Sequence, residues 1–150
     1  MRPEPFRLHA ASYPTWVDVS TRESDVDGQG HVNSLWLGFL FREGWTMLQS
    51  RLVGESDRST PVRRYLVARI TFDYLREIFH PSTVQVGVGV LAVGRSSLTL
   101  GCGMFHDGVA AALADYTVVH ADAKGPVAWP DQARERAQGL LLSTDSDPIV

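Results

Sequence analysis

The sequence has almost no cysteine, no strong excess of either charge and no apolar run of membrane-spanning length. Cys102 is the only cysteine among 150 residues, so an intrachain disulfide and a cysteine metal site are both excluded. Lysine and arginine number 14 against 17 acidic residues, and the arginines are scattered along the chain and not interleaved with aromatic residues. We therefore expect no nucleic acid and no membrane as partner. The first residues also lack the apolar core of a signal peptide, which predicts a cytoplasmic protein.

The length and the hydrophobic content of 44% suit one compact domain and are small for two. We place that domain at residues 1–130. Residues 131–150 are expected to form a short helix over 131–138 and a polar, mobile tail.

The most informative segment is residues 25–33, where two aspartates, a histidine and two glycines precede a long apolar stretch. Asn33 or Ser34 is a good helix N-cap, and a helix is predicted from Ser34 to about residue 52. Free amide groups and the positive end of the helix dipole would then lie close to Asp27 and His31. Such an arrangement suits chemistry in which an oxygen gains negative charge.

The rest of the chain alternates between apolar and polar residues, as strands do. We predict strands at 16–22, 66–74, 84–90, 97–106 and 109–120, a loop at 54–61, and a tight hairpin at Asp107-Gly108. The last four strands are expected to form an antiparallel meander, and those at 66–74 and 84–90 to bury one face each. Apolar residues cover most of the helix circumference, which predicts burial on all sides. The fold class is therefore α+β, with one long buried helix wrapped by a curved antiparallel sheet.

Four segments resemble landmarks of the hotdog-fold thioesterases, in the branch similar to 4-hydroxybenzoyl-CoA thioesterase. Residues 22–34 (RESDVDGQGHVNS) resemble the pattern R-x-x-D-x-D-x-x-G-H-V-N-N at the entry to the helix. Residues 41–43 are similar to the F-E-E of that helix, and residues 94–97 to a G-x-S-S between two strands. Residues 119–130 look like the closing strand with its trailing turn and proline. Together the matches extend over about residues 15–135.

The resemblance implies that Asp27 is the catalytic carboxylate, acting as nucleophile or as general base for water. His31 is its nearest helper, and the backbone N–H of Ser34 would polarise the thioester carbonyl. Gln29 stands where related acyl-carrier-protein thioesterases have Asn, so it is a candidate for orienting water. The resemblance also places a coenzyme A arm near Arg95, Ser96 and Ser97.

Several of these residues also have a purely structural interpretation. Asp25 is expected to be structural, as an Asp in a glycine-rich turn often is. Arg95, Ser96 and Ser97 suit an ordinary polar hairpin. Glu43, on a helix predicted to be buried, should pair with Arg69 or line the cavity, where it would join Asn33 among the substrate-binding residues. His80, His106 and His120 are interpreted as surface residues, and no metal or cofactor site is expected.

The sequence thus predicts an enzyme that hydrolyses an acyl-CoA or acyl-carrier-protein thioester to a free acid and a thiol. The alternatives are a hotdog domain that binds acyl thioesters without hydrolysing them, a biosynthetic carrier-protein thioesterase, and a dehydratase on the same fold. Unpaired sheet edges predict a homodimer or homotetramer.

Overall fold

The computed structural model describes residues 2–53 and 64–145, so the loop predicted at 54–61 and the end of the polar tail lie outside the described residues. The strands are β1 (Thr15–Ser20), β2 (Arg64–Tyr74), β3 (Thr83–Val93), β4 (Ser97–His106), β5 (Val109–Asp122) and β6 (Gly125–Pro126). The helices are α1 (Ser34–Val53) and α2 (Asp131–Gln138), and single 3-10 turns occupy Pro5–Leu8, Ala10–Ser12 and Glu23–Asp25. The predicted α1, β4 and α2 are confirmed, with α1 one residue longer at its C-terminal end.

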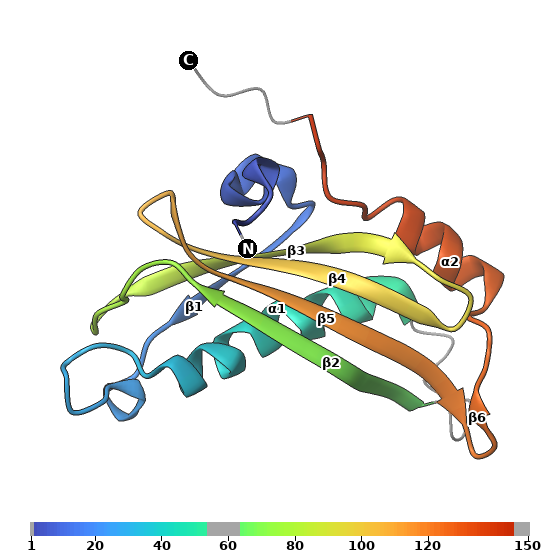
Figure 1. Ribbon diagram of the computed structural model, residues 1–150, viewed down its shortest axis with the longest axis horizontal. Coiled ribbons are helices and arrows are strands. Elements are labelled where there is room, and N and C mark those ends of the chain that lie inside the picture. The colour runs from blue at the N-terminus through green and yellow to red at the C-terminus, as the bar shows by residue number, and fades with distance from the viewer. Residues whose placement is uncertain (1, 54–63, 146–150) are drawn as a thin grey trace.

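The sheet is antiparallel and curls around α1, which runs along its inner face (Figure 1). The main core is the interface between them, because alternate residues of β3 and β4 point toward the helix: Val84, Val86, Val88, Val90, Leu98, Leu100, Cys102 and Met104. The turn between β4 and β5 has positive φ at both Asp107 (51°) and Gly108 (75°), as a tight hairpin requires. The α+β class and the hotdog arrangement are confirmed.

The predicted four-stranded meander is wrong for one strand. The strand order is β1-β3-β4-β5-β2, so β3, β4 and β5 follow one another but β2 lies beside β5. A strand has only two edges, and those of β3 are taken by β1 and β4. The chain therefore crosses from β2 to β3 through residues 75–82 instead of turning directly.

β2 is an edge strand, and its predicted buried face is largely exposed. Leu66, Ile70 and Tyr74 are 49%, 43% and 51% exposed, and Val67 on the other side of the predicted alternation is also exposed at 46%. A register shift between Val67 and Arg69 interrupts the alternation where β2 pairs with β5. Only Phe72 of the predicted face packs against the main core.

The helix α1 is buried on one face and not on all sides as predicted. Its buried residues recur at helical spacing and face the sheet: Leu37, Leu40, Phe41, Gly44, Leu48 and Leu52. Leu35, Phe39 and Met47 on the opposite side are 79%, 51% and 36% exposed. The apolar composition of α1 therefore led to a prediction of more burial than this chain provides.

The outer face of the sheet carries a second, smaller core. Tyr13, Phe105, Ala110 and Leu142 form it, with Trp16 and Leu91 packed alongside. Gly103 allows the close approach, because a Cβ there would lie 2.6 Å from the Tyr13 hydroxyl. The N-terminal and C-terminal segments meet on this face, where the Ser143 N–H donates to the Ser12 carbonyl at 2.9 Å.

Arg7 fastens the N-terminal segment to the outer face. It is 5% exposed, lies 2.5 Å from Asp115 of β5 and donates to the Ala114 carbonyl. At the other end of the chain, α2 inserts Ala133 and Ala137 into the main core. Over the described ranges, neither helix has the length and apolar character needed to cross a membrane.

Candidate active site

Residues 26–32 form a small closed loop at the entrance to α1. Val26 and Val32 form a bridge, the Asp27 N–H donates to the His31 carbonyl at 3.0 Å, and the Gly30 N–H donates to the Asp27 carbonyl at 3.1 Å. Gly30 has a φ of +89°, which explains the glycine, since other residues are strained there. The loop thereby fixes Asp27 and His31 beside each other.

Asn33 is the residue that caps α1. Its Oδ1 accepts from the Leu35 N–H at 2.8 Å and its carbonyl accepts from the Trp36 N–H at 2.9 Å. No backbone bond among the described residues uses the Ser34 N–H, which lies at the positive end of a 20-residue helix. The Ser34 amide is thus available to a ligand, whereas the Asn33 side chain, predicted to bind substrate, is occupied by the cap.

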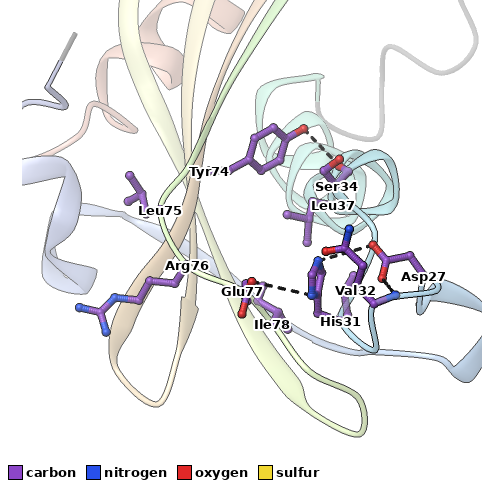
Figure 2. Close-up of a pocket in the computed structure, with 11 residues that line it drawn as sticks. Asp27, His31, Val32, Ser34, Leu37, Tyr74, Leu75, Arg76, Glu77 and Ile78 are labelled. Carbon is purple, nitrogen blue, oxygen red and sulfur yellow. Dashed lines mark hydrogen bonds and ion pairs between the residues drawn. The ribbon is translucent and has the colours of Figure 1, made fainter.

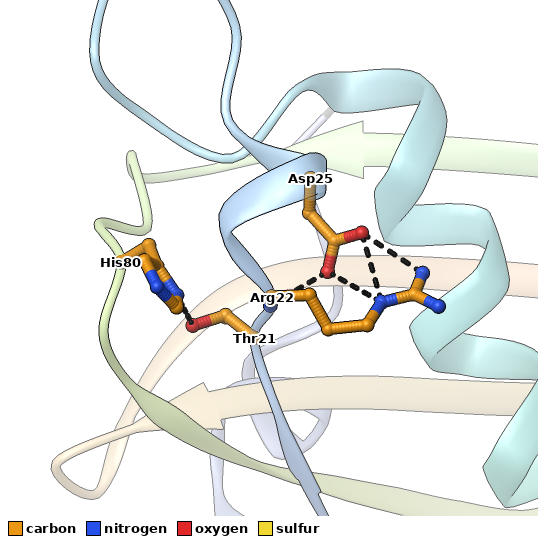
Figure 3. A network of polar contacts seen from close by, with 4 residues as sticks. All are labelled: Thr21, Arg22, Asp25 and His80. Atoms are coloured by element: carbon orange, nitrogen blue, oxygen red, sulfur yellow. Dashed lines mark hydrogen bonds and ion pairs between the residues drawn. The ribbon is translucent and has the colours of Figure 1, made fainter.

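Asp25 has a structural role next to this loop, as expected from the sequence (Figure 3). Its carboxylate is buried and accepts from the Arg22 N–H at 2.9 Å and from Arg22 Nε at 3.1 Å, with Nη2 at 2.8 Å. Its carbonyl accepts from the Asn33 N–H. Burial by itself would raise the pKa of Asp25, but the bonds from Arg22 outweigh it and hold the pKa below its usual value. Nearby, the Thr21 hydroxyl oxygen and His80 Nδ1 are hydrogen-bonded at 2.9 Å.

A pocket of about 460 Å³ opens in front of the loop (Figure 2). Asp27, Gln29, His31 and Ser34 line one side, and residues 74–78 with Val32 and Leu37 line the rest. Asp27 Oδ2 lies 3.5 Å from His31 Nε2, and Asp27 Oδ1 accepts from the Gln29 N–H at 2.8 Å. The Tyr74 hydroxyl donates to the Ser34 carbonyl at 3.2 Å. A carboxylate, an imidazole and a free helix amide therefore share one pocket, as the sequence predicted.

The other predicted substrate-binding residues lie away from this pocket. Glu43 is exposed on α1 and forms no ion pair with Arg69 within the described ranges, because α1 is not buried on that side. Arg95 and Ser96 lie in the turn between β3 and β4, and Ser97 is the first residue of β4, at the opposite end of the sheet (Figure 1). Backbone bonds hold that turn: the Ser96 carbonyl accepts from His120 and the Arg95 carbonyl from Trp129.

Arg76 and Glu77 line the pocket and were not predicted from the sequence. They follow β2 in the crossover to β3, and only the folded path brings them to His31, so no local pattern identifies them. The only sequence feature that pointed to them is the presence of a basic and an acidic residue directly after the strand predicted at 66–74.

His120 was wrongly predicted to lie on the surface. It is 1% exposed, and its ring lies in a stack with Tyr65 and Trp129, at centroid distances of 5.7 and 5.0 Å. Its position at the end of β5 did not reveal this, because the covering Trp129 arrives from the segment before α2. Within residues 2–53 and 64–145, no three His, Cys, Asp or Glu side chains are grouped to hold a metal ion.

Comparison with known families gives one clear match. A family model described as the thioesterase-like superfamily matches residues 19–137, from the last residues of β1 to the last turn of α2. No curated protein sequence matches the chain significantly.

Solved structures give the same result. A thioesterase from Thermus thermophilus, crystallised with coenzyme A and Zn, is 31% identical, with a TM-score of 0.72 over 86% of this chain and 95% of its own. A Pseudomonas aeruginosa protein is 27% identical, with a TM-score of 0.76 over 88% of this chain and 94% of its own. The DHNA-CoA thioesterase of Staphylococcus aureus shares the fold. It is 18% identical, with a TM-score of 0.74 over 84% of this chain and 91% of its own.

Proposed function

Because the chain belongs to the thioesterase-like superfamily, we propose that it hydrolyses an acyl thioester, with Asp27 as the catalytic carboxylate. The observation that carries this proposal is the shared pocket of Asp27, His31 and the free Ser34 amide. Coenzyme A in the crystal of the 31% identical Thermus thioesterase supports acyl-CoA as the substrate, with an acyl-carrier-protein thioester as the runner-up. The lone buried cysteine suits a cytoplasmic enzyme.

The geometry fits hydrolysis by an activated water. The thioester carbonyl oxygen would accept from the Ser34 N–H, and Asp27 would take a proton from water as its oxygen attacks the carbonyl carbon. The charge that forms on the carbonyl oxygen faces the helix amide, where one fixed donor is typically worth roughly 3 kcal/mol. Collapse of the tetrahedral intermediate breaks the C–S bond, and the thiolate leaves and gains a proton. His31 and Gln29 would orient the carboxylate and the water.

We propose further that the active enzyme is a homodimer formed through β2. The edge strand exposes Leu66, Val67 and Ile70, and exposed apolar edges favour continuation of the sheet in a second copy. Antiparallel pairing of two β2 strands would place the pocket end of one, at Tyr74, beside the Tyr65 end of the other. The turn at 95–97 lies at this second end, so it would approach the partner's pocket and not its own.

The oligomeric state is tested by light scattering at micromolar concentration. A dimer mass is expected, and Ile70→Lys should shift it toward the monomer, because a charge would be buried where two edges meet. A monomer mass for the wild-type protein in this measurement would contradict the dimer.

The catalytic role is tested by thiol release from a panel of acyl-CoA and acyl-carrier-protein substrates with aryl and medium-length fatty acyl groups. Asp27→Ala should remove nearly all turnover while the protein stays folded, and Asp27→Asn should behave similarly, because it keeps the shape and loses the charge. An Asn variant that keeps more than about a tenth of the wild-type rate, a barrier change under ~1.4 kcal/mol, would refute the role of Asp27.

A further inference from the structure

His31 lies between two carboxylates, of which only Asp27 enters the proposed mechanism. Nε2 of the ring is 3.5 Å from Asp27 Oδ2, and Nδ1 is 3.9 Å from Glu77 Oε1. Figure 2 shows the three side chains in one row, with His31 between Glu77 and Asp27. The His31 side chain is 20% exposed, whereas that of Glu77 is 65% exposed.

The backbone fixes Glu77 relative to His31. The Val32 N–H donates to the Ile78 carbonyl at 2.7 Å, and His31 forms an antiparallel bridge with Phe79. The Phe79 ring meets the His31 ring edge-on, at 90° and a centroid distance of 6.2 Å. Two segments far apart in the sequence are thus joined at the pocket, and Glu77 stands on the joined segment.

An imidazole can turn about its bond to Cβ and exchange the positions of its ring nitrogens and carbons. A carboxylate beside one nitrogen favours one of the two ring orientations, as a hydrogen-bonding partner of the second nitrogen does in other functional histidines. We propose that Glu77 is a positioning residue, which holds Nδ1 of His31 so that Nε2 stays directed at Asp27. This role rests on the proposed hydrolysis, in which His31 orients the Asp27 carboxylate.

The test combines steady-state kinetics with a matched control. Glu77→Gln should lower kcat about fivefold, ~1 kcal/mol, which is the upper range for partly exposed ion pairs, and leave KM unchanged. Glu77→Asp keeps the charge and should recover at least half of the loss. Glu135→Gln on α2, an exposed glutamate far from the pocket, should have the wild-type kcat.

The decisive comparison uses His31→Ala as the background. If Glu77 acts through His31, Glu77→Gln should cost nothing further once the imidazole is gone. An equal cost in both backgrounds, or a Glu77→Gln variant as fast as Glu135→Gln, would overturn the positioning role.

A readout that needs no turnover separates this inference from the proposed function. The ring ¹⁵N resonances of His31, measured by long-range ¹H–¹⁵N correlation, should shift in Glu77→Gln and stay in place in Glu135→Gln. If the wild type hydrolyses no thioester, the proposed function fails, and these resonances alone decide whether Glu77 holds the ring. Unchanged resonances in Glu77→Gln would overturn the contact itself.

Discussion

Asp25→Asn and Asp27→Asn are the same substitution two residues apart, and the structure predicts opposite consequences. The Asp25 carboxylate is buried and bonded to Arg22 through its backbone and its guanidinium. The Asp27 carboxylate faces the pocket and accepts one backbone bond, from Gln29, which an Asn side chain can also accept. Asp25→Asn should therefore lower stability and spare turnover per folded molecule, whereas Asp27→Asn should abolish turnover and spare stability.

The size of the Asp25 effect follows from the bonds that are lost. Asn keeps an oxygen for the Arg22 N–H but loses the charge that faces the guanidinium. A hydrogen bond to a charged group contributes about 1.5–3 kcal/mol, and the Arg22 side chain is 61% exposed, so water partly replaces its lost partner. We expect a loss of about 2 kcal/mol in the free energy of unfolding, which lowers Tm by roughly 4–8 °C in a domain of this size.

The loss should depend on pH in a defined direction. The pKa of Asp25 is lowered in the folded protein, because the bonds from Arg22 outweigh the effect of burial. The stabilisation is then complete above the unfolded pKa of ~3.9 and disappears as pH falls through the lower folded value. Urea unfolding should give a constant difference between wild type and Asp25→Asn from pH 8 to 5, and a shrinking difference below about pH 4. A difference that keeps its full size at pH 2.5, or none at pH 7, would refute this reasoning.

Three further predictions concern the core and the site. Gly44→Ala should cost about 1–3 kcal/mol of stability, because the new Cβ would meet Val88 and lie 2.8 Å from Val86. Gly38→Ala in the same helix should be neutral or stabilising, because its Cβ meets only Phe72, at 3.5 Å, and chemical unfolding compares the two variants. The Cys102 thiol is fully buried and burial raises its pKa, so a disulfide reagent should label it only after unfolding, and labelling of the native protein at the unfolded rate would contradict this. His31→Ala and Gln29→Ala should each slow thioester hydrolysis roughly 10- to 100-fold, less than Asp27→Ala does, and a larger loss for His31→Ala would move the principal role to the histidine.

The sequence predicted what depends on local pattern. The loop before α1, the cap at Asn33 or Ser34, the Asp107-Gly108 hairpin and α2 all follow from short-range rules, and the structure contains each of them, with Asn33 as the cap. The placement of Asp27, Gln29, His31 and Ser34 around one pocket was predictable for the same reason, because a few consecutive residues carry them all.

What the sequence did not predict depends on neighbours distant along the chain. The pairing of β2 with β5 decides which residues of β2 are exposed, and no alternation within β2 contains that information. Glu77 reaches His31, and Trp129 covers His120, only through the folded path. The prediction that Glu43 pairs with Arg69 or lines the cavity assumed that the apolar helix is covered on all sides. One chain covers only a single face of the helix, and Glu43 lies on the exposed side.

The meeting of residues 12 and 143 on the outer face of the sheet has a practical consequence. Ser143 places the C-terminal end of the described chain on the side away from α1, the β2 edge and the Asp27 pocket (Figure 1). Pro3, near the N-terminal end, instead shares a neighbouring pocket with Leu75 and Arg76, which also line the Asp27 pocket. A tag, a surface tether or a fused domain at the C-terminal end would therefore leave the pocket and the pairing edge accessible, whereas one at the N-terminal end would start close to the residues that line the pocket.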